Sequence, residues 1–550
     1  MLLLPIGIDD YRHVKQSCFY FDRTRFLKEI HDSPTSSVFL YTRPRRFGKS
    51  LMMSMVSYFY DIRLSSAPLF DGMAVSSLPE VYSEMNSCPV IHLDLKGLGF
   101  SNEEEFYSSL AMRMADLYRD LIDEKVKDVL DSSQKEYVAS IEKEEADKAR
   151  LSASLLRLSH YLCSAYDKSV FILVDEYDAP LQEAKENGFY DSVQLFMRSF
   201  LGNALKGNPH LNKAILTGVT QIAQASIFSD LNNLIVNNII GGREEFFGFK
   251  QEETTEILSY YGYKGSLEEV KEWYGGYRFQ GEEVYNPWSI LNFISNGFLF
   301  QPYWVNTGSY LTIRRAIEEI GSKNSNGFLS LLQGDAVFAD FRHSISLSSS
   351  LDGPALYSLL AYSGYLSALR TPIIGRYVFQ IPNNEIKACF RSEILSGLTD
   401  SSSLSRLYEI GRALSQNDPK AFENAFSDFV LTCFSYLDLT SEKAYQIMIV
   451  TLSSILFENC IVKSERDAGK GRCDIMILDK KDQYCYILEL KYRKNRPSES
   501  SLLSSASLAL EQAIDLRYYE EAKRRNIPKI FVFGMAFSGK RIKVVSKSIS

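Results

Sequence analysis

The stretch LYTRPRRFGKSLMMS, residues 40–54, ends like a phosphate-binding loop but begins differently. The usual pattern of such a loop is Gly, four residues, then Gly-Lys-Ser, which would place its first glycine at position 43. This chain has Arg43 there, while Gly48, Lys49 and Ser50 match the rest of the pattern. The stretch therefore raises the question of whether it binds a nucleotide.

The residues on either side of the loop have the pattern that a nucleotide site requires. The run SVFLYT, residues 37–42, predicts a strand before the loop, and the apolar run after Ser50 predicts a helix. Loop amides and a helix N-terminus both present positive partial charge to phosphate. We therefore expect Lys49 to contact the β- and γ-phosphates of ATP, Ser50 to ligate Mg²⁺, and Gly48 to allow close approach of the backbone.

A second stretch, FILVDE at residues 171–176, supplies the acidic groups that such a site needs. Asp175, at the end of an apolar strand, is expected to hold the Mg²⁺ shell, and Glu176 to orient or activate the attacking water. A buried strand with capping acids would account for Asp175 alone, but not for the loop. A further strand ends near Thr217, whose hydroxyl is either a sensor of the γ-phosphate or an ordinary turn threonine.

Four short, β-branched runs predict an α/β fold in which helices cover a parallel sheet. The runs are residues 37–42, 88–95, 169–178 and 213–219. Between the second and third runs, residues 102–161 are charged and have helical periodicity, which predicts a helical insertion.

The bulk composition is typical of a globular chain with several domains: 550 residues, 45% hydrophobic and 23% charged. Eight cysteines without close pairs and six histidines without ligand spacing predict neither a disulfide framework nor a zinc site. The chain has no apolar stretch near the about 20 residues of a membrane span, and its N-terminal apolar run is too short for a signal peptide. We expect a cytoplasmic protein with no membrane partner.

The charge is uneven along the chain, although the net charge is only −7. From Lys491 to Ser550 there are 13 basic and 5 acidic residues, a local charge of +8. Such a segment is either a surface that contacts nucleic-acid phosphates or a solvated lysine-rich tail. Tyr518 and Tyr519 in this segment either stack on bases or, as we favour, pack against a sheet.

Residues 471–492, GRCDIMILDKKDQYCYILELKY, predict a hairpin with three converging polar groups. Side chains alternate along a strand, so Glu489 and Lys491 share one face, and Asp474 on the first strand can join them. The two carboxylates suit Mg²⁺-dependent phosphodiester hydrolysis, in which Lys491 positions the nucleophile or stabilises developing charge. The alternative is a salt-bridged hairpin that has lost catalysis. Other Glu-x-Lys tripeptides occur in predicted helices, at 183–185, 269–271 and 521–523.

The first 310 residues resemble the AAA-ATPase-like family of bacterial and some eukaryotic proteins. The resemblance rests on the stretches PIGIDDYRHV, YFDRT, RPRRFGKS, ILVDEYDAPL, LTGVTQIAQASIFSDLNNL, WYGGYRF and YNPWSILNF. In that family the loop itself reads Arg-Pro-Arg-Arg-Phe-Gly-Lys, which implies that Arg43 is a family trait. Arg43 and Pro44 should then stiffen the loop entry, and Arg45 and Arg46 should place two more charges near the phosphates.

One position departs from the family pattern. Similar sequences usually carry a basic residue after Thr-Gly-Val, where this chain has Gln221. If that basic residue stabilises transition-state charge, hydrolysis here is slow, or Arg45, Arg46 or a partner replaces it.

The C-terminal part resembles the nuclease-like domain that accompanies this ATPase, and its Asp, Glu and Lys form the constellation of the PD-(D/E)xK fold. The resemblance implies that Gln512 of the following helix belongs to the site. A helical acid, Glu442, completes it, or else Glu465 in the loop SERDAGKGR does.

The middle of the chain alternates short helices with aromatic turns and contains all three tryptophans. It is either an aromatic core or an ATPase lid whose Arg278 reaches the nucleotide. Residues 359–369 and the strand after them suit a winged-helix module. The expected fold class is α/β: a P-loop NTPase sheet, a helical and winged-helix-like middle, and a C-terminal PD-(D/E)xK nuclease-like fold. The expected domains are residues 1–250, 251–370, 371–439 and 440–550.

Two hypotheses about function follow from these expectations. In the first, a P-loop ATPase controls a metal-dependent nuclease acting on nucleic acid, in particular DNA, in genome defence or mobile-element maintenance. In the second, the chain is a nucleotide-switched regulator or adaptor whose C-terminal domain binds nucleic acid without cleaving it. Gln221 favours the second, and the complete C-terminal residue set favours the first. The oligomeric state stays open.

Overall fold

The computed structural model divides the chain into two compact units, one formed by Met1–Gly308 with Phe338–Glu385 and one by Ser309–Val337 with Ile386–Ser550. Each unit is described by itself below. The structure describes residues 2–221, 228, 231–242, 245–304, 327, 330–331, 334–345, 352–398, 401–433, 442–457, 460–479 and 481–549.

The first unit is built on a five-stranded parallel sheet in the order β2-β3-β4-β1-β5. Its strands are β1 Val38–Thr42, β2 Val90–Asp94, β3 Val170–Asp175, β4 Leu211–Gly218 and β5 Leu234–Asn237. The α/β prediction is confirmed, and four of the strands lie where apolar runs predict them. The edge strand β5 was not expected, because it has four residues of which three are only half-buried.

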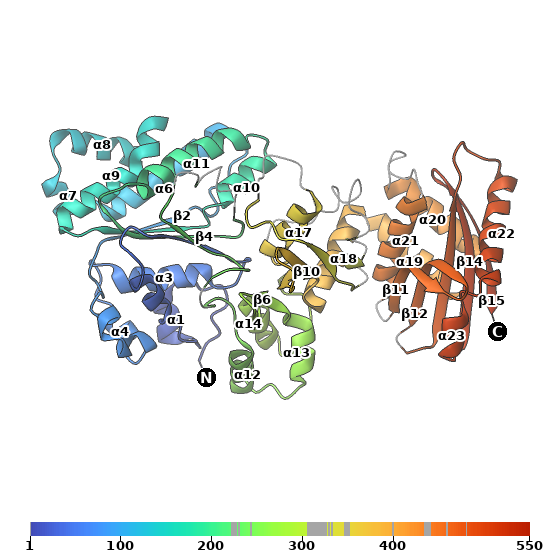
Figure 1. Ribbon diagram of the computed structural model, residues 1–550. Helices are drawn as coiled ribbons and strands as arrows, with labels where there is room; N and C mark the ends of the chain where they lie inside the picture. Colours follow the sequence, from blue (N-terminus) through green and yellow to red (C-terminus); the bar gives the residue numbers. More distant parts are fainter. Residues whose placement is uncertain are drawn as a thin grey trace. The chain divides into compact units, whose positions relative to one another are not determined.

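Helices cover both faces of this sheet (Figure 1). On one face, α6 Glu103–Leu121, α9 Lys148–Tyr166 and α11 Tyr190–Leu205 bury an extensive apolar cluster. The smaller helices near them are α7 Glu124–Val129, α8 Ser132–Glu142 and α10 Ala179–Glu186. The predicted helical insertion is therefore present, with no strand between residues 102 and 161.

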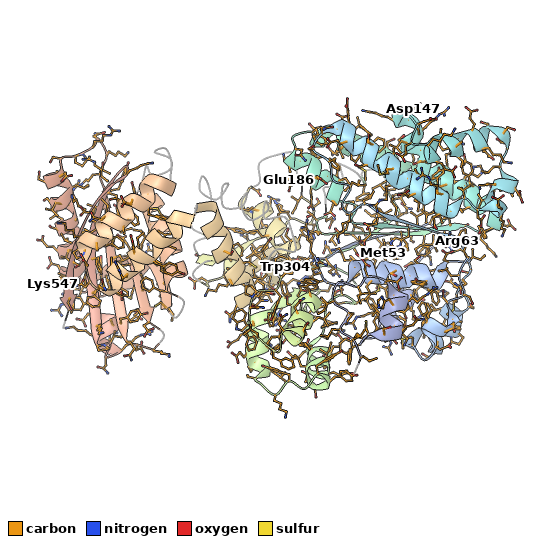
Figure 2. The ribbon with its side chains drawn as sticks, turned by 180° about the vertical axis from the view of Figure 1, so that it is seen from behind. Met53, Arg63, Asp147, Glu186, Trp304 and Lys547 are labelled. Carbon is orange, nitrogen blue, oxygen red and sulfur yellow. The ribbon has the colours of Figure 1, made fainter. Side chains whose placement is uncertain are left out.

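The other face of the sheet carries α3, Lys49–Tyr60, which begins directly after the loop of the opening stretch. Met53 of this helix is fully buried (Figure 2). Shorter helices complete this side: α1 Tyr11–Ser17, α2 Phe26–His31, α4 Ala67–Phe70, η1 Ala74–Ser77 and α5 Pro79–Tyr82.

The rest of the first unit is a helical part followed by a small winged part. The helical part contains α12 Gln251–Tyr260, α13 Leu267–Tyr274, the hairpin β6 Tyr277–Phe279 with β7 Glu282–Val284, and α14 Pro287–Ser295. The winged part contains β8 Val337–Asp340, α17 Gly353–Tyr362, β9 Ser367–Arg370 and β10 Arg376–Gln380. Its sheet has the order β8-β10-β9, with β9 and β10 antiparallel, and the winged-helix module stays a prediction.

The second unit is a five-stranded mixed sheet in the order β11-β12-β13-β14-β15, with only the β13–β14 pair parallel. Its strands are β11 Cys460–Ala468, β12 Gly471–Asp479, β13 Tyr484–Tyr492, β14 Lys529–Ser538 and β15 Arg541–Ile549. Its helices are α18 Asn384–Leu398, α19 Ser401–Ser415, α20 Pro419–Cys433, α21 Glu442–Leu456, α22 Glu499–Asp515 and α23 Glu520–Arg524.

Two of these strands differ from the expectations. The segment expected as the loop SERDAGKGR is mostly strand β11, and the end of the basic tail is strand β15. In β15 apolar Ile542 and Val544 are buried and alternate with basic Arg541 and Lys543. Arg541 and Lys543 are half-buried and contact the Pro497 carbonyl oxygen and Glu423, and the backbone of β15 pairs fully with β14, so this part of the basic segment is not a solvated tail.

A close backbone contact fixes α22 on this sheet. Gly534 of β14 lies against α22 so closely that a Cβ there would be 2.2 Å from the carbonyl oxygen of Ala506. A side chain at this position would push the helix off the sheet, so glycine is required.

Within the described part of the chain, no helix has the length and apolar character needed to cross a membrane.

Candidate functional site

The phosphate loop in the first unit has the backbone geometry that its sequence predicts. Gly48 adopts φ 91°, in the left-handed region, and a Cβ there would meet no atom within 4 Å. The buried Nζ of Lys49 donates to the carbonyl oxygens of Arg43 at 3.1 Å and Pro44 at 3.2 Å. Ser50, half-buried, is the second residue of α3. The loop amides, Lys49 and Ser50 thus lie together at a helix N-terminus, which suits a phosphate group.

Neighbouring strands bring the predicted acidic residues to this loop. Asp175 is the last residue of β3, and its Oδ1 accepts hydrogen bonds from the Thr217 hydroxyl of β4 and from the Glu176 amide. Oε1 of Glu176 lies 3.6 Å from Nζ of Lys49. Because β4 pairs with both β1 and β3, these groups meet at the carboxyl ends of three adjacent strands.

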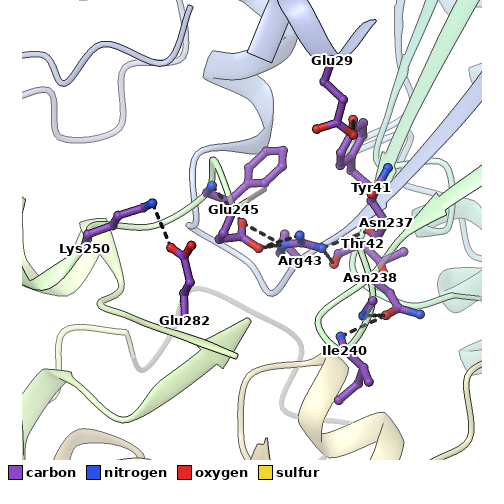
Figure 3. A network of polar contacts seen from close by, with 12 residues as sticks. Glu29, Tyr41, Thr42, Arg43, Asn237, Asn238, Ile240, Glu245, Lys250 and Glu282 are labelled. Carbon is purple, nitrogen blue, oxygen red and sulfur yellow. Dashed lines mark hydrogen bonds and ion pairs between the residues drawn. The ribbon is translucent and has the colours of Figure 1, made fainter. Parts of the chain in front are cut away.

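Arg43, which replaces the usual glycine, is fully buried and forms an ion pair (Figure 3). Its Nη2 lies 2.7 Å from Oε2 of Glu245, whose side chain is also fully buried. Its Nη1 donates to the carbonyl oxygens of Thr42 at 2.8 Å and Asn237 at 3.0 Å. The arginine therefore joins the end of β1 to β5 and to a segment 202 residues later in the chain, which is a structural function and not a phosphate contact.

Restoring the usual glycine at position 43 should therefore weaken the fold. Arg43→Gly leaves the buried carboxylate of Glu245 without its cation, which should cost about 3 to 5 kcal/mol of unfolding free energy. Chemical denaturation measures this loss. The double variant Arg43→Met with Glu245→Leu is the control, because replacing both charges with apolar groups should recover most of the stability. Equal stability of Arg43→Gly and the wild type would contradict this interpretation.

The residues between Arg43 and Gly48 contact the aromatic side chains of the helical part. The guanidinium of Arg46 lies 4.2 Å from the ring centre of Trp288, and the carbonyl oxygen of Arg45 accepts from Nε1 of Trp304 at 3.2 Å. Trp304 is labelled in Figure 2. Phe47 packs on the rings of Tyr277 and Phe279, with centroid distances of 5.2 and 5.0 Å. The phosphate loop thus rests on an aromatic surface.

This contact predicts a fluorescence signal for nucleotide binding. If Arg46 turns toward phosphate, it must leave the ring of Trp288, so ATP should change the tryptophan emission. Trp288→Phe should remove more than about half of that change, because it removes the cation–π contact. Trp273→Phe is the matched control, since Trp273 stacks on Phe300 instead of the loop. An ATP signal that survives in Trp288→Phe would contradict the prediction.

The structure gives Gln221 and Arg278 polar partners outside the loop residues 43–50. The buried Gln221 accepts hydrogen bonds from Nδ2 of Asn238 at 3.0 Å and from the Tyr362 hydroxyl at 3.4 Å, so its amide joins the sheet to the winged part. Arg278 lies 3.6 Å from Glu283 in its own hairpin. The aromatic residues around it are largely buried, which supports the aromatic core over the lid.

Glu385, at the start of α18, is the last residue of the first unit, and its buried carboxylate holds the segment around Trp304. Glu385, which has no exposed surface, accepts from the Ser289 hydroxyl at 2.7 Å and from the amides of Tyr303 and Trp304, both at 2.9 Å. Burial raises the pKa of Glu385 from 4.5 to about 7, although these hydrogen bonds act in the opposite direction. Glu385 therefore holds the segment whose indole contacts the phosphate loop.

This shift predicts a pH-dependent effect of Glu385→Gln on stability. The folded state holds the proton more tightly than the unfolded state, so Glu385 favours folding at low pH and loses this contribution as pH rises from about 4.5 through 7. The loss is at most about 3 kcal/mol. The unfolding free energy of Glu385→Gln minus that of the wild type should therefore be about 1 to 3 kcal/mol larger at pH 8 than at pH 5. Chemical denaturation at both pH values tests this, and a pH-independent difference would contradict it.

In the second unit, the predicted polar residues of the hairpin meet on the face of the sheet that α22 covers. Glu489, 2% exposed, accepts at Oε1 from Nε2 of Gln512 on α22 at 2.6 Å. Nζ of Lys491 lies 3.5 Å from the same oxygen. Oδ2 of Asp474 accepts from the Leu490 amide at 2.7 Å. The structure thus brings together Asp474, Glu489, Lys491 and Gln512.

Helix α21 contributes two more side chains to this site. Its first residue, Glu442, accepts from the Tyr492 amide at 3.0 Å. Burial is the main cause that raises the pKa of Asp474, and the negative charge of Glu442 raises it further. Gln446, one turn later, donates to the carbonyl oxygen of Asp474 at 3.0 Å. Gln446 was not expected, although its spacing of four from Glu442 on a predicted helix is a signal for it. Glu465 lies on β11, and its side chain is outside the described residues.

Comparison with known proteins shows what these two units resemble. Residues 5–228 match the family model described as "Predicted AAA-ATPase", and residues 440–547 match that of the "PD-(D/E)XK nuclease superfamily". Each match covers less than half of the chain, so it shows which part of the chain resembles which family. It is also 24% identical to a protein of Azotobacter chroococcum mcd 1 described as "Uncharacterized protein in vnfD 5'region", over 97% of this chain and 96% of that protein. Both resemblances expected from the sequence are confirmed.

The nuclease superfamily domain carries a carboxylate that suits a metal ion. The pKa of Glu489 is raised to about 7, mainly by burial and to a smaller extent by the negative charge of Asp474. No described residue hydrogen-bonds to Oε2 of Glu489, although this atom is buried. A buried oxygen without a partner is costly, and a divalent cation would satisfy it. The residues present therefore fit a metal that Asp474 and Glu489 would hold.

Further ligands for such a metal must come from other groups. Among the described residues, no cluster of three or more His, Cys, Asp or Glu side chains is arranged to hold a metal ion. Mg²⁺ commonly binds through one or two carboxylates and completes its shell with water and substrate phosphates. Two carboxylates at this site are therefore consistent with a cation that a phosphodiester substrate helps to bind.

The surface next to this site is basic. Arg493, Lys494 and Arg496 are exposed in the loop that follows Lys491. Arg541 donates to the carbonyl oxygen of Pro497 at 2.9 Å and so supports this loop from β15. Tyr518, in contrast, is buried in the core of the nuclease superfamily domain, which agrees with packing and not with base stacking.

Proposed function

We propose that this protein binds and hydrolyses ATP with Mg²⁺ at the phosphate loop, and that its C-terminal domain cleaves nucleic acid, DNA in particular, with a divalent metal. We further propose that the nucleotide state controls cleavage. The observation that carries the nuclease proposal is the buried Glu489, whose Oε2 has no described hydrogen-bond partner, beside Asp474 and Lys491.

At the ATP site, the residues act on phosphate, metal and water. Lys49 exchanges its carbonyl partners for the β- and γ-phosphates, and the loop amides surround these groups. Ser50 and Asp175 would hold Mg²⁺, which neutralises charge on the phosphates. Glu176, adjacent to Lys49, orients the attacking water, and Thr217 keeps Asp175 in place.

The loop arginines have different functions in this proposal. Arg46 is exposed and, among the described residues, its guanidinium lies over the ring of Trp288, so it is available to phosphate charge. Arg45 is half-buried and is the second candidate. Either of them would supply the positive charge that Gln221 cannot supply.

At the nuclease site, Asp474 and Glu489 would hold the metal, which activates water and offsets phosphate charge. Lys491, about one-third exposed, positions the attacking water or stabilises charge on the phosphate. Gln512 fixes the orientation of Glu489, and Gln446 fixes the backbone of Asp474. The exposed arginines and lysine after β13 contact the phosphates of the nucleic-acid backbone.

The nuclease proposal is tested with purified full-length protein, plasmid DNA and single-stranded DNA, in Mg²⁺ or Mn²⁺. We expect cleavage by the wild type, and none by Glu489→Ala or Asp474→Asn. DNA binding without cleavage in every metal would favour the second hypothesis, a nucleotide-switched adaptor. Equal cleavage by the wild type and both variants would refute the assignment of this site.

A further inference from the structure

The acidic stretch Asp175-Glu176-Tyr177-Asp178 contains a third carboxylate, that of Asp178, which has no part in the proposed contacts to phosphate, metal or water. Asp178 has no exposed surface. Its Oδ2 accepts from the amides of Thr220 at 2.8 Å and Val219 at 3.2 Å, and from Nε2 of Gln182 at 2.8 Å. Its carboxylate therefore binds the backbone where the chain leaves β4.

The residue before it contacts the same segment. The amide of Tyr177 donates to the carbonyl oxygen of Thr217 at 3.0 Å, and its hydroxyl donates to that of Thr220 at 2.8 Å. Gly218 lies between these contacts, and a Cβ there would be 2.6 Å from Oδ1 of Asp178. Tyr177 and Asp178 thus hold the end of β4 by hydrogen bonds at three residues, Thr217, Val219 and Thr220.

Both the buried carboxylate of Asp178 and the backbone conformation of Glu176 cost folding free energy. A buried carboxylate is stable only when several hydrogen bonds compensate for its lost hydration. Glu176 lies between Asp175, the proposed metal ligand, and Tyr177. It adopts φ 53°, a backbone conformation that residues other than glycine rarely adopt. Such strain persists where the surrounding contacts impose it, and it is concentrated at functional sites.

We propose that Asp178 is a positioning residue of the ATP site. It fixes the end of β4 against the end of β3, so that Thr217 and Glu176 keep their positions beside Asp175 and Lys49. This inference rests on the proposed ATP hydrolysis. Asp178 does not touch the phosphates, so its function should appear in turnover and not in nucleotide affinity.

The test compares Asp178→Asn with a matched variant, Asp61→Asn, in full-length protein. Asparagine with its oxygen at the Oδ2 position would place an NH₂ group where Oδ1 accepts from the Val219 amide at 3.2 Å, which opposes two donors and weakens the contact without changing its size. Asp61 is also buried and accepts from the Arg63 amide at 3.0 Å, but it follows the far end of α3. We expect Asp178→Asn to lower kcat for ATP at least about tenfold with the Kd for ATP within about threefold, and Asp61→Asn to lower the Tm while leaving kcat unchanged.

A milder variant keeps the test valid if Asp178→Asn does not fold. Tyr177→Phe removes only the hydrogen bond to Thr220, so we expect a severalfold lower kcat and an unchanged Kd for ATP. A wild-type kcat in these variants would overturn the inference, as would a parallel loss of kcat, affinity and Tm. Absence of ATP hydrolysis in the wild type would overturn the proposed function and this inference with it, whereas the other outcomes concern Asp178 alone.

Discussion

Replacing Glu489 with glutamine is expected to lower the rate of metal-dependent DNA cleavage at least about 100-fold while leaving the fold intact. Glutamine can still accept the hydrogen bond from Gln512, but it lacks the charge that a divalent cation requires. Since the carboxylate is 2% exposed and burial raises its pKa to about 7, removing its charge should not destabilise the domain at neutral pH. The comparison requires cleavage rates and Tm values for both proteins, and calorimetric titration with Mn²⁺ should show weaker binding by the variant.

The chain offers a closely matched control for this substitution. Glu521 belongs to a second Glu-x-Lys tripeptide of the same domain, but it lies on helix α23 and is outside the site. Glu521→Gln should cleave DNA and bind Mn²⁺ like the wild type. Equal losses in Glu489→Gln and Glu521→Gln would mean that charge in general, and not this site, supports cleavage.

Replacing Lys49 with alanine is expected to weaken ATP binding at least about tenfold and to abolish measurable hydrolysis. Its ammonium group is the cation placed between the loop carbonyls and Glu176, at distances of 3.1 to 3.6 Å. Without it, Glu176 faces the phosphates with its charge uncompensated. Nucleotide titration and phosphate release measure the two effects.

Lys28→Ala is the control for this second prediction. Lys28 lies in the same domain, and its side chain is 45% exposed and pairs with Asp32. We expect its affinity for ATP and its rate of hydrolysis to equal those of the wild type. An unchanged affinity for ATP in Lys49→Ala would contradict the assignment of the phosphate loop.

The parallel sheet and the two groups of polar residues that the structure brings together could be predicted because their signals are local in the sequence. An apolar strand followed by Gly-Lys-Ser, or one that ends in Asp-Glu, identifies a carboxyl edge of the sheet without knowledge of its neighbours. The hairpin of residues 471–492 likewise places its carboxylates by the alternation of side chains along a strand. Local patterns therefore identified which polar residues lie together, although not their supporting contacts.

The contacts that could not be predicted join residues far apart in the chain. The buried partner of Arg43 lies 202 residues later, and Gln446 meets the Asp474 backbone only because α21 packs on the sheet. Gln221, expected as a catalytic departure, instead takes part in packing with Tyr362. No periodicity in the sequence reports such pairings, since they depend on the tertiary fold.

The central claim of this account is that one chain couples an ATP site to a nuclease site. The measurement that tests it most directly is the DNA cleavage rate of the full-length protein at saturating metal, with and without ATP, for the wild type and Lys49→Ala. We predict that ATP changes the wild-type rate at least about tenfold and leaves the Lys49→Ala rate unchanged. Wild-type cleavage that proceeds at the same rate with and without ATP would contradict the coupling.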